Sequence, residues 1–127
     1  MLLILYSSLI SYMVFFAICI APVSNKVLDS KNRSVFLRTV FPKNFKFGLV
    51  LSVVCLMLSG YLKNNISLVF SVILMLGFLL NLYAVMPKIN NAADQPDQKK
   101  KFKRLHFISV FIYSIQIIIA IAGVILF

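Results

Sequence analysis

The sequence predicts an all-α membrane protein with four transmembrane helices in an up-down antiparallel bundle. Hydrophobic residues make up 61% of the 127-residue chain, whereas charged residues make up 13%. A soluble domain of this size cannot bury so much apolar surface, so the bilayer must act as its solvent. The charges are also segregated, because all but one of the 13 Lys and Arg residues lie in two polar segments, residues 23–46 and 87–105. The length corresponds to a single domain.

The first span covers residues 2–22. It contains no charged residue, and 21 residues of helix reach about 31 Å, which is enough to cross the hydrocarbon core. Pro22 is expected to help end this helix. The segment lacks the positive n-region of a signal peptide, so we expect it to be retained.

The first polar segment, residues 23–46, contains a second helical pattern. Apolar residues between Lys31 and Phe41 follow helical spacing, with basic residues mainly on the opposite side. Ser30 is a candidate N-cap and Pro42 a candidate stop. We interpret Lys31–Phe41 as a short amphipathic helix at the interface, and an ordinary ordered loop is the alternative.

Three further spans follow. Residues 47–62 form a short second span, which Lys46 and Lys63 extend by snorkelling to the two surfaces. A tight turn at residues 63–65 leads into the third span, residues 66–86, which Pro87 is expected to end. Residues 87–105 are predicted to be a solvated loop, and residues 106–127 form the last span.

The charge distribution also predicts the orientation. Positively charged loops of this length stay in the cytoplasm, so both termini are expected outside a bacterial inner (plasma) membrane. Basic loops beside apolar spans favour anionic lipid headgroups on the cytoplasmic side as partners, and nucleic acid is not expected. The residues expected to make these lipid contacts are Lys31, Arg33, Arg38, Lys99, Lys100, Lys101 and Lys103.

The last span has a stripe of polar and small residues. His106, Ser109, Tyr113 and Gln116 share one face, and Ala120 and Gly123 continue it as candidate packing positions. Related positions on the other spans are Ser8, Ser11 and Cys19, then Ser52, Cys55 and Ser59, then Ser71, Gly77 and Asn81. Such faces are typical of contacts between transmembrane helices. The alternative is a polar cavity for a small ligand.

A second candidate site lies at the inner mouth of the predicted bundle. Asn81 lies about a turn and a half inside the cytoplasmic surface, and Arg104 and His106 begin the last span. Asn25 and Asn44 flank the corresponding ends of the first two spans. We expect these groups to gather at the inner mouth, next to the polar face of Ser109, Tyr113 and Gln116. His106 is either an interfacial hydrogen-bonding residue or a titrating functional group.

The composition of the spans argues against several chemistries. None has an acidic or basic residue in its interior, and the three acids lie in the polar segments, so proton-coupled transport and hydrolytic catalysis are disfavoured. A single His supplies at most one axial ligand of a haem. Soft-metal ligands such as Cys19 and Cys55 show no repeated spacing. We therefore expect no enzyme activity, no cofactor and no metal site.

Four strings carry a family resemblance. In order they are FAICIAP at 16–22, FPKNF with FGL at 41–49, NLY with MPKIN at 81–90, and RLH at 104–106 followed by Ser109. Together they resemble the transmembrane-protein-205-like family, small four-helix membrane proteins that carry a domain-of-unknown-function label in bacteria. The resemblance implies the same four-span fold and a link to resistance against a platinum drug. The matched positions are Pro22, Phe41, Pro42, Phe45, Asn81, Pro87, Arg104 and His106.

The function that these observations favour is that of a non-enzymatic accessory or scaffold component of a membrane assembly, within a larger complex or as a homo-oligomer. One alternative is a small transporter or resistance factor for a small molecule or soft-metal compound. A second alternative is a haem- or quinone-associated redox protein.

Overall fold

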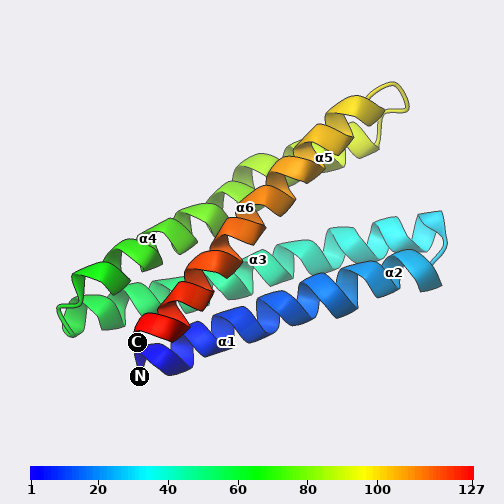
Figure 1. Ribbon diagram of the computed structural model, residues 1–127. Helices are drawn as coiled ribbons and strands as arrows, with labels where there is room; N and C mark the ends of the chain where they lie inside the picture. Colours follow the sequence, from blue (N-terminus) through cyan, green and yellow to red (C-terminus); the bar gives the residue numbers. More distant parts are fainter.

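The computed structural model describes residues 1–127 as four long antiparallel helices, as predicted (Figure 1). The helices cover Leu2–Val27, Ser30–Tyr61, Asn65–Ala93 and Lys99–Leu126, and each is long and apolar enough to cross a membrane. Both termini and the turn at residues 62–64 lie at one end, which we call the terminal end. The connections at residues 28–29 and 94–98 lie at the other end, the basic end.

Two of the four helices contain a π-helical segment. The first helix consists of α1 (Leu2–Phe15), η1 (Phe16–Ile20) and α2 (Ala21–Val27). The third consists of α4 (Asn65–Leu79), η2 (Leu80–Val85) and α5 (Met86–Ala93). The second and fourth, α3 (Ser30–Tyr61) and α6 (Lys99–Leu126), are uninterrupted.

Pro22 and Pro87 do not end their helices, and this corrects the sequence-based prediction. Each lies at the start of an α-helical segment that directly follows a π segment. A proline lacks a backbone N–H and its ring clashes with a carbonyl one turn earlier. A local π adjustment accommodates the ring and re-satisfies the freed backbone groups, so the helix continues.

Pro42 is also inside a helix, and the predicted stop at this residue is wrong. The segment Lys31–Phe41 is helical, but it is the first part of α3 and not a separate interfacial helix. Residues 23–46 and 87–105 are therefore largely helical, with only short connections between the helices. A 32-residue helix extends about 48 Å, so its ends project beyond a hydrocarbon core about 30 Å thick.

The two helical hairpins repeat one sequence pattern. Pro22, Asn25 and Asp29 follow the first π segment, and Pro87, Asn90 and Asp94 follow the second with the same spacing. In each hairpin the acidic residue lies where the first helix has just ended. Asp29 caps α3, since its Oδ1 accepts a hydrogen bond from the Asn32 backbone N–H at 2.8 Å.

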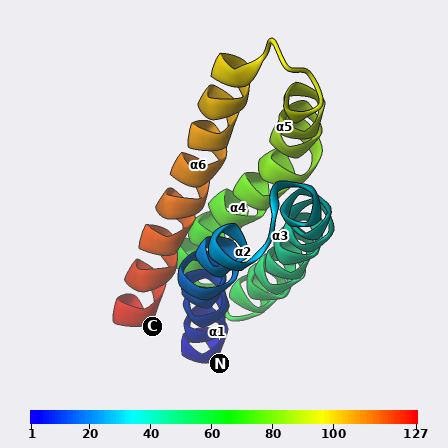
Figure 2. The same ribbon diagram turned by 90° about the vertical axis from the view of Figure 1, so that its right-hand side faces the viewer.

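The helices change neighbours along the bundle. Toward the terminal end α3 packs on α4 and α1 packs on α6, whereas toward the basic end α2 lies with α3 and α5 lies with α6. Figure 2, which views the molecule from the basic end, shows these two pairs apart. We call α2 with the first part of α3 the first arm, and α5 with the first part of α6 the second arm.

The half of the bundle near the terminal end is closed by packing and by a hydrogen-bonded cluster. We call Ser59, Ser67 and Ser71 the serine cluster; all three and Tyr6 have no exposed surface. The Tyr6 hydroxyl lies 3.0 Å from Ser67 Oγ, which lies 2.6 Å from Ser59 Oγ. Ser59 donates in turn to the Cys55 carbonyl at 2.6 Å. Each of these four hydroxyls has a hydrogen-bond partner, as burial in an apolar region requires.

Candidate functional site: a basic cleft between two arms

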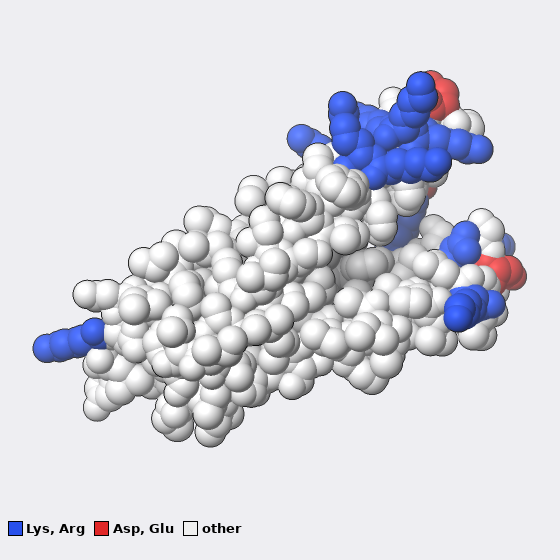
Figure 3. All heavy atoms as spheres, viewed as in Figure 1, with Lys and Arg blue, Asp and Glu red and all other residues white.

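A cavity lies between the two arms at the basic end. Its volume is about 460 Å³, which falls in the range of small-molecule sites. One wall is the first part of α3, and the other is formed by α5, the 94–98 connection and the start of α6. We call this cavity the basic cleft. In Figure 3 the basic side chains form two groups with a hollow between them.

Four cationic side chains line the basic cleft from both walls. Arg33 and Arg38 come from α3, and Lys99 and Lys103 come from α6. Arg38 is the one member with an acidic partner, because its guanidinium contacts both carboxylate oxygens of Asp94, at 2.5 and 3.3 Å. The other three cations have no ion pair. The cleft therefore has an excess of positive charge.

The Arg38–Asp94 ion pair connects the arms directly. Arg38 Nη2 also lies 3.4 Å from the Asn90 carbonyl, so it contacts α5 as well as the following connection. Hydrogen bonding from Arg38 holds the pKa of the Asp94 carboxyl below its ordinary value. The Asp94 side chain is solvent-exposed and that of Arg38 is partly exposed, so the pair contributes little to overall stability.

The deeper lining of the cleft is apolar. Phe41 and Met86 approach from the two arms, and Phe102 lies on the α6 side. Phe41 stacks near Phe45 at 6.0 Å and meets Phe16 edge-on at 5.2 Å. These contacts close the bottom of the cleft against the bundle. The cleft is consequently amphipathic, with charges at its mouth and aromatic and thioether groups inside.

A layer of buried polar side chains lies among the four helices, next to Phe45 and farther from the basic end. The Tyr113 hydroxyl lies 3.4 Å from both the Asn44 side-chain oxygen and the Met13 carbonyl, and Asn81 Nδ2 lies 3.5 Å from the Ser109 carbonyl. Several buried atoms of this layer have no hydrogen-bond partner: Tyr12 Oη, Asn44 Nδ2, Asn81 Oδ1 and Gln116 Oε1. Such atoms are costly to bury in an apolar setting unless water or another polar group satisfies them.

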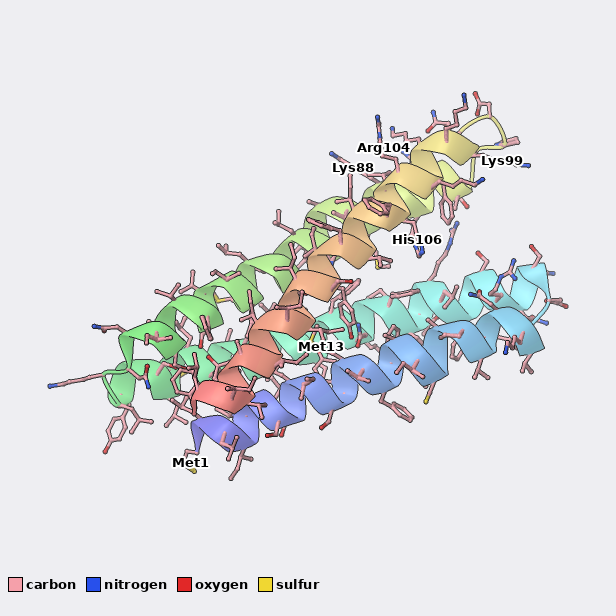
Figure 4. All side chains as sticks on the ribbon, in the orientation of Figure 1. Met1, Met13, Lys88, Lys99, Arg104 and His106 are labelled. Carbon is pink, nitrogen blue, oxygen red and sulfur yellow. The ribbon has the colours of Figure 1, made fainter.

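Arg104 and His106 do not join the predicted inner-mouth cluster. Both are exposed, and neither lines the basic cleft, whereas Asn81, Tyr113 and Gln116 are buried or half-buried among the helices. His106 lies parallel to the ring of Phe102 at 6.3 Å. Figure 4 shows His106 leaving α6 on the side of the first arm and Arg104 leaving on the opposite side.

The residues of the predicted stripe on α6 differ in burial along the helix. Ser109 and Tyr113 are half-buried, and Gln116 is 1% exposed with its amide donating to the Leu74 carbonyl at 2.8 Å. Ala120 and Gly123 are fully packed. A Cβ atom at position 123 would lie 2.3 Å from the Tyr6 ring, so glycine permits the close approach of α1 and α6.

The polar face predicted for the first span is wrong, because Ser8, Ser11 and Cys19 are all exposed on the outside of the bundle. The buried face of α1 is instead apolar and aromatic, with Leu2, Tyr6, Leu9 and Met13. The faces predicted for the next two helices are buried. Their buried residues are Ser52, Cys55 and Ser59 on α3, Ser71 and Gly77 on α4, and Asn81 on η2.

The basic residues proposed for lipid contact divide into two groups. Arg33, Arg38, Lys99 and Lys103 line the basic cleft, whereas Lys31, Lys100 and Lys101 are exposed outside it. Sequence reasoning missed the apolar lining, including Phe41 and Met86, and the half-buried Tyr12, whose hydroxyl oxygen is buried. The one available signal was the pair of strings around Phe41 and Met86, which the resemblance had singled out. No group of three or more His, Cys, Asp and Glu side chains is placed to hold a metal ion.

The fold places the chain among multi-pass membrane proteins built from four apolar helices. It belongs to the family of the domain of unknown function DUF4149, whose model matches residues 4–98. The matched region holds the first three helices and the 94–98 connection, and it stops where α6 begins. No curated protein and no solved structure matches the chain.

Proposed function

We propose that the protein is a non-enzymatic accessory or scaffold component of a membrane assembly. The observation that supports this most is the use of the polar stripe of α6 for contacts between helices. Tyr113 reaches the backbone of α1, Asn81 reaches the backbone of α6, and Gln116 reaches the backbone of α4. A stripe engaged in this way stabilises the contacts between the helices of the bundle.

The accessory role predicts a stable partner. The protein would be purified gently from its native membrane, and everything that remains bound would be identified by mass spectrometry and absorbance. A stoichiometric larger complex is the expected result and would name the process that the protein serves. A homo-oligomer with neither partner nor chromophore would contradict the accessory role.

We also propose that the basic end faces the cytoplasm of a bacterial cell and that both termini lie outside. Reversing this orientation would move nearly all cationic side chains across the membrane against the potential. A C-terminal alkaline phosphatase fusion is expected to be active, and the matching green-fluorescent-protein fusion dark. The opposite pair of results would reverse the orientation.

A small transporter or resistance factor is the second candidate. It is favoured by a cleft between the two arms at the basic end and by the unpartnered polar atoms of the buried layer. A Gln116→Leu variant that stayed folded and abundant but no longer supported export or resistance would favour this function. We also propose, from the four matched strings, that the chain is related to the transmembrane-protein-205-like family. That relationship would favour a role in resistance.

A further inference from the structure

We propose that the basic cleft binds one anionic phospholipid, with its phosphate among Arg33, Lys99 and Lys103 and its acyl chains leaving the cleft past Phe41 and Met86. This inference depends on the membrane location assumed above, but not on the accessory role. It is also narrower than general attraction between basic loops and a lipid surface, because it names one cleft with defined walls.

The first argument is electrostatic. Arg33 approaches from α3, and Lys99 and Lys103 approach from α6, so cations of two separate arms share one cavity. The one acid that pairs with a cleft cation, Asp94, is engaged by Arg38. Like charges in one cleft repel each other unless an anion lies between them. A phosphate group supplies that anion and accepts several charge-assisted hydrogen bonds at once.

The second argument is the apolar interior. Below the cations the walls present Leu37, Phe41, Met86, Ile89 and Phe102. A free phosphate or a nucleic acid would leave this surface uncovered, whereas a phospholipid covers it with its glycerol and upper acyl chains. The occupant that matches both surfaces is therefore an amphiphile with an anionic head.

The third argument is access. The volume of about 460 Å³ accommodates a headgroup and the upper part of the chains, but not a whole phospholipid. The remainder of the chains must leave the cavity. Figure 3 shows the hollow open at the basic end and toward the viewer's side, between the two groups of basic side chains. A lipid can therefore enter from the bilayer without crossing the closed bundle.

The experiment compares two triple variants of the full-length protein. Arg33→Gln/Lys99→Gln/Lys103→Gln removes the three unpaired cations of the cleft. Lys31→Gln/Lys100→Gln/Lys101→Gln removes the same charge from exposed positions nearby, outside the cleft lining. Each protein is titrated with phosphatidylglycerol or phosphatidylethanolamine in detergent micelles and examined by native mass spectrometry.

The unmodified protein and the exposed-charge variant are expected to retain one phosphatidylglycerol per chain. The cleft variant should bind it about tenfold more weakly, because it loses several charge-assisted contacts. Equal weakening in both variants would overturn the proposal in favour of non-specific surface attraction. Equal retention of phosphatidylethanolamine would overturn the requirement for an anionic head.

A second pair of variants tests the cavity without changing charge. Ala93→Trp fills the cleft from the second arm, and Asn91→Trp places the same bulk on α5 outside the lining. Loss of bound phosphatidylglycerol in the Ala93 variant alone is expected, and unchanged binding would overturn the site. Copurification of a protein partner is measured separately, so failure of lipid binding and failure of the accessory role give different results.

Discussion

The two halves of the bundle use the same helices in different ways. On one stripe of α6, His106 near the basic end is exposed, Ser109 and Tyr113 are half-buried, and Gln116 and Gly123 near the terminal end are buried. The spacing along the helix does not change, so the difference comes from the neighbouring helices. Toward the terminal end α1 lies against α6, whereas toward the basic end the two arms separate.

This difference shows how one small fold combines stability with a binding cavity. The half near the terminal end places its small residues at close helix contacts and pairs its hydroxyls within the serine cluster. The half near the basic end has a cleft between its arms, which is lined by unpaired cations and crossed by one ion pair. We expect substitutions in the first half to change folding and substitutions in the second to change arm geometry and ligand binding.

The largest expected effect is that of Gly123→Leu. Its side chain would overlap the Tyr6 ring, where even a Cβ atom would lie 2.3 Å away. Overpacking a helix contact of this kind should destabilise the protein by about 3 kcal/mol or more. The measurement is unfolding in mixed detergent–SDS micelles.

Gly60→Leu is the matched control, because a Cβ atom at Gly60 meets nothing within 4 Å. It should leave the free energy of unfolding unchanged or slightly higher, since leucine favours the helix more than glycine does. Similar losses in the two variants would contradict the idea that α1 and α6 meet at Gly123.

The next effect is that of Ser67→Ala in the serine cluster. It removes contacts to the Tyr6 hydroxyl and to Ser59 Oγ. The loss should be about 1 kcal/mol, since Tyr6 keeps the Ser67 carbonyl at 3.3 Å and Ser59 keeps the Cys55 carbonyl. Ser114→Ala, which removes only a bond within α6 at an exposed position, should change the stability by less than about 0.5 kcal/mol. Equal losses of stability in the two variants would show that the serine cluster contributes no more than an exposed hydrogen bond within one helix.

Much of this fold could be predicted because hydropathy and charge report directly on a bilayer. Four apolar runs separated by basic segments allow few arrangements other than four antiparallel helices. Helix ends were not predictable in the same way. Pro22 and Pro87 were predicted to end their helices. The π segments that accommodate them depend on a change of hydrogen-bond register that no residue type encodes.

The site was predicted only in part, for a related reason. The stripe from Ser109 to Gly123 was visible because helical spacing is fixed, but spacing does not say where a neighbouring helix departs. His106 was therefore predicted to belong to the same interior cluster as Gln116, although its side chain is exposed. The basic cleft brings α3 together with α5 and α6, and contacts between distant segments leave no local pattern.

A smaller effect is expected for Gln116→Leu, which tests whether this residue serves packing. The variant loses one hydrogen bond to the Leu74 carbonyl but also removes the unpartnered Oε1 atom. Bonds between transmembrane helices average about 0.6 kcal/mol, so unfolding should change by about that amount or less. A loss above about 2 kcal/mol would show that Gln116 organises the buried polar layer.

The smallest expected effect on stability, and a distinct one on geometry, is that of Asp94→Asn. Removing the partner of Arg38 should lengthen the mean distance between the arms and broaden its distribution. The free energy of global unfolding should not change. Spin labels at Lys31→Cys and Lys100→Cys in a Cys19→Ser background report that distance by double electron–electron resonance, since Cys55 is buried. Asp97→Asn, in the same connection but without an ion pair, is the control and should leave the distance unchanged.

The pH dependence of the same distance follows from the pKa of Asp94. Because Arg38 lowers this pKa, the carboxylate stays charged at mildly acidic pH, and the ion pair is lost only as the pH falls through the lowered value. The arms should therefore keep their spacing down to the ordinary pKa range of a carboxyl group and separate below it. The Asp94→Asn protein should show the wider spacing at every pH. A distance that is the same in both proteins and constant with pH would mean that packing alone sets the opening of the basic cleft.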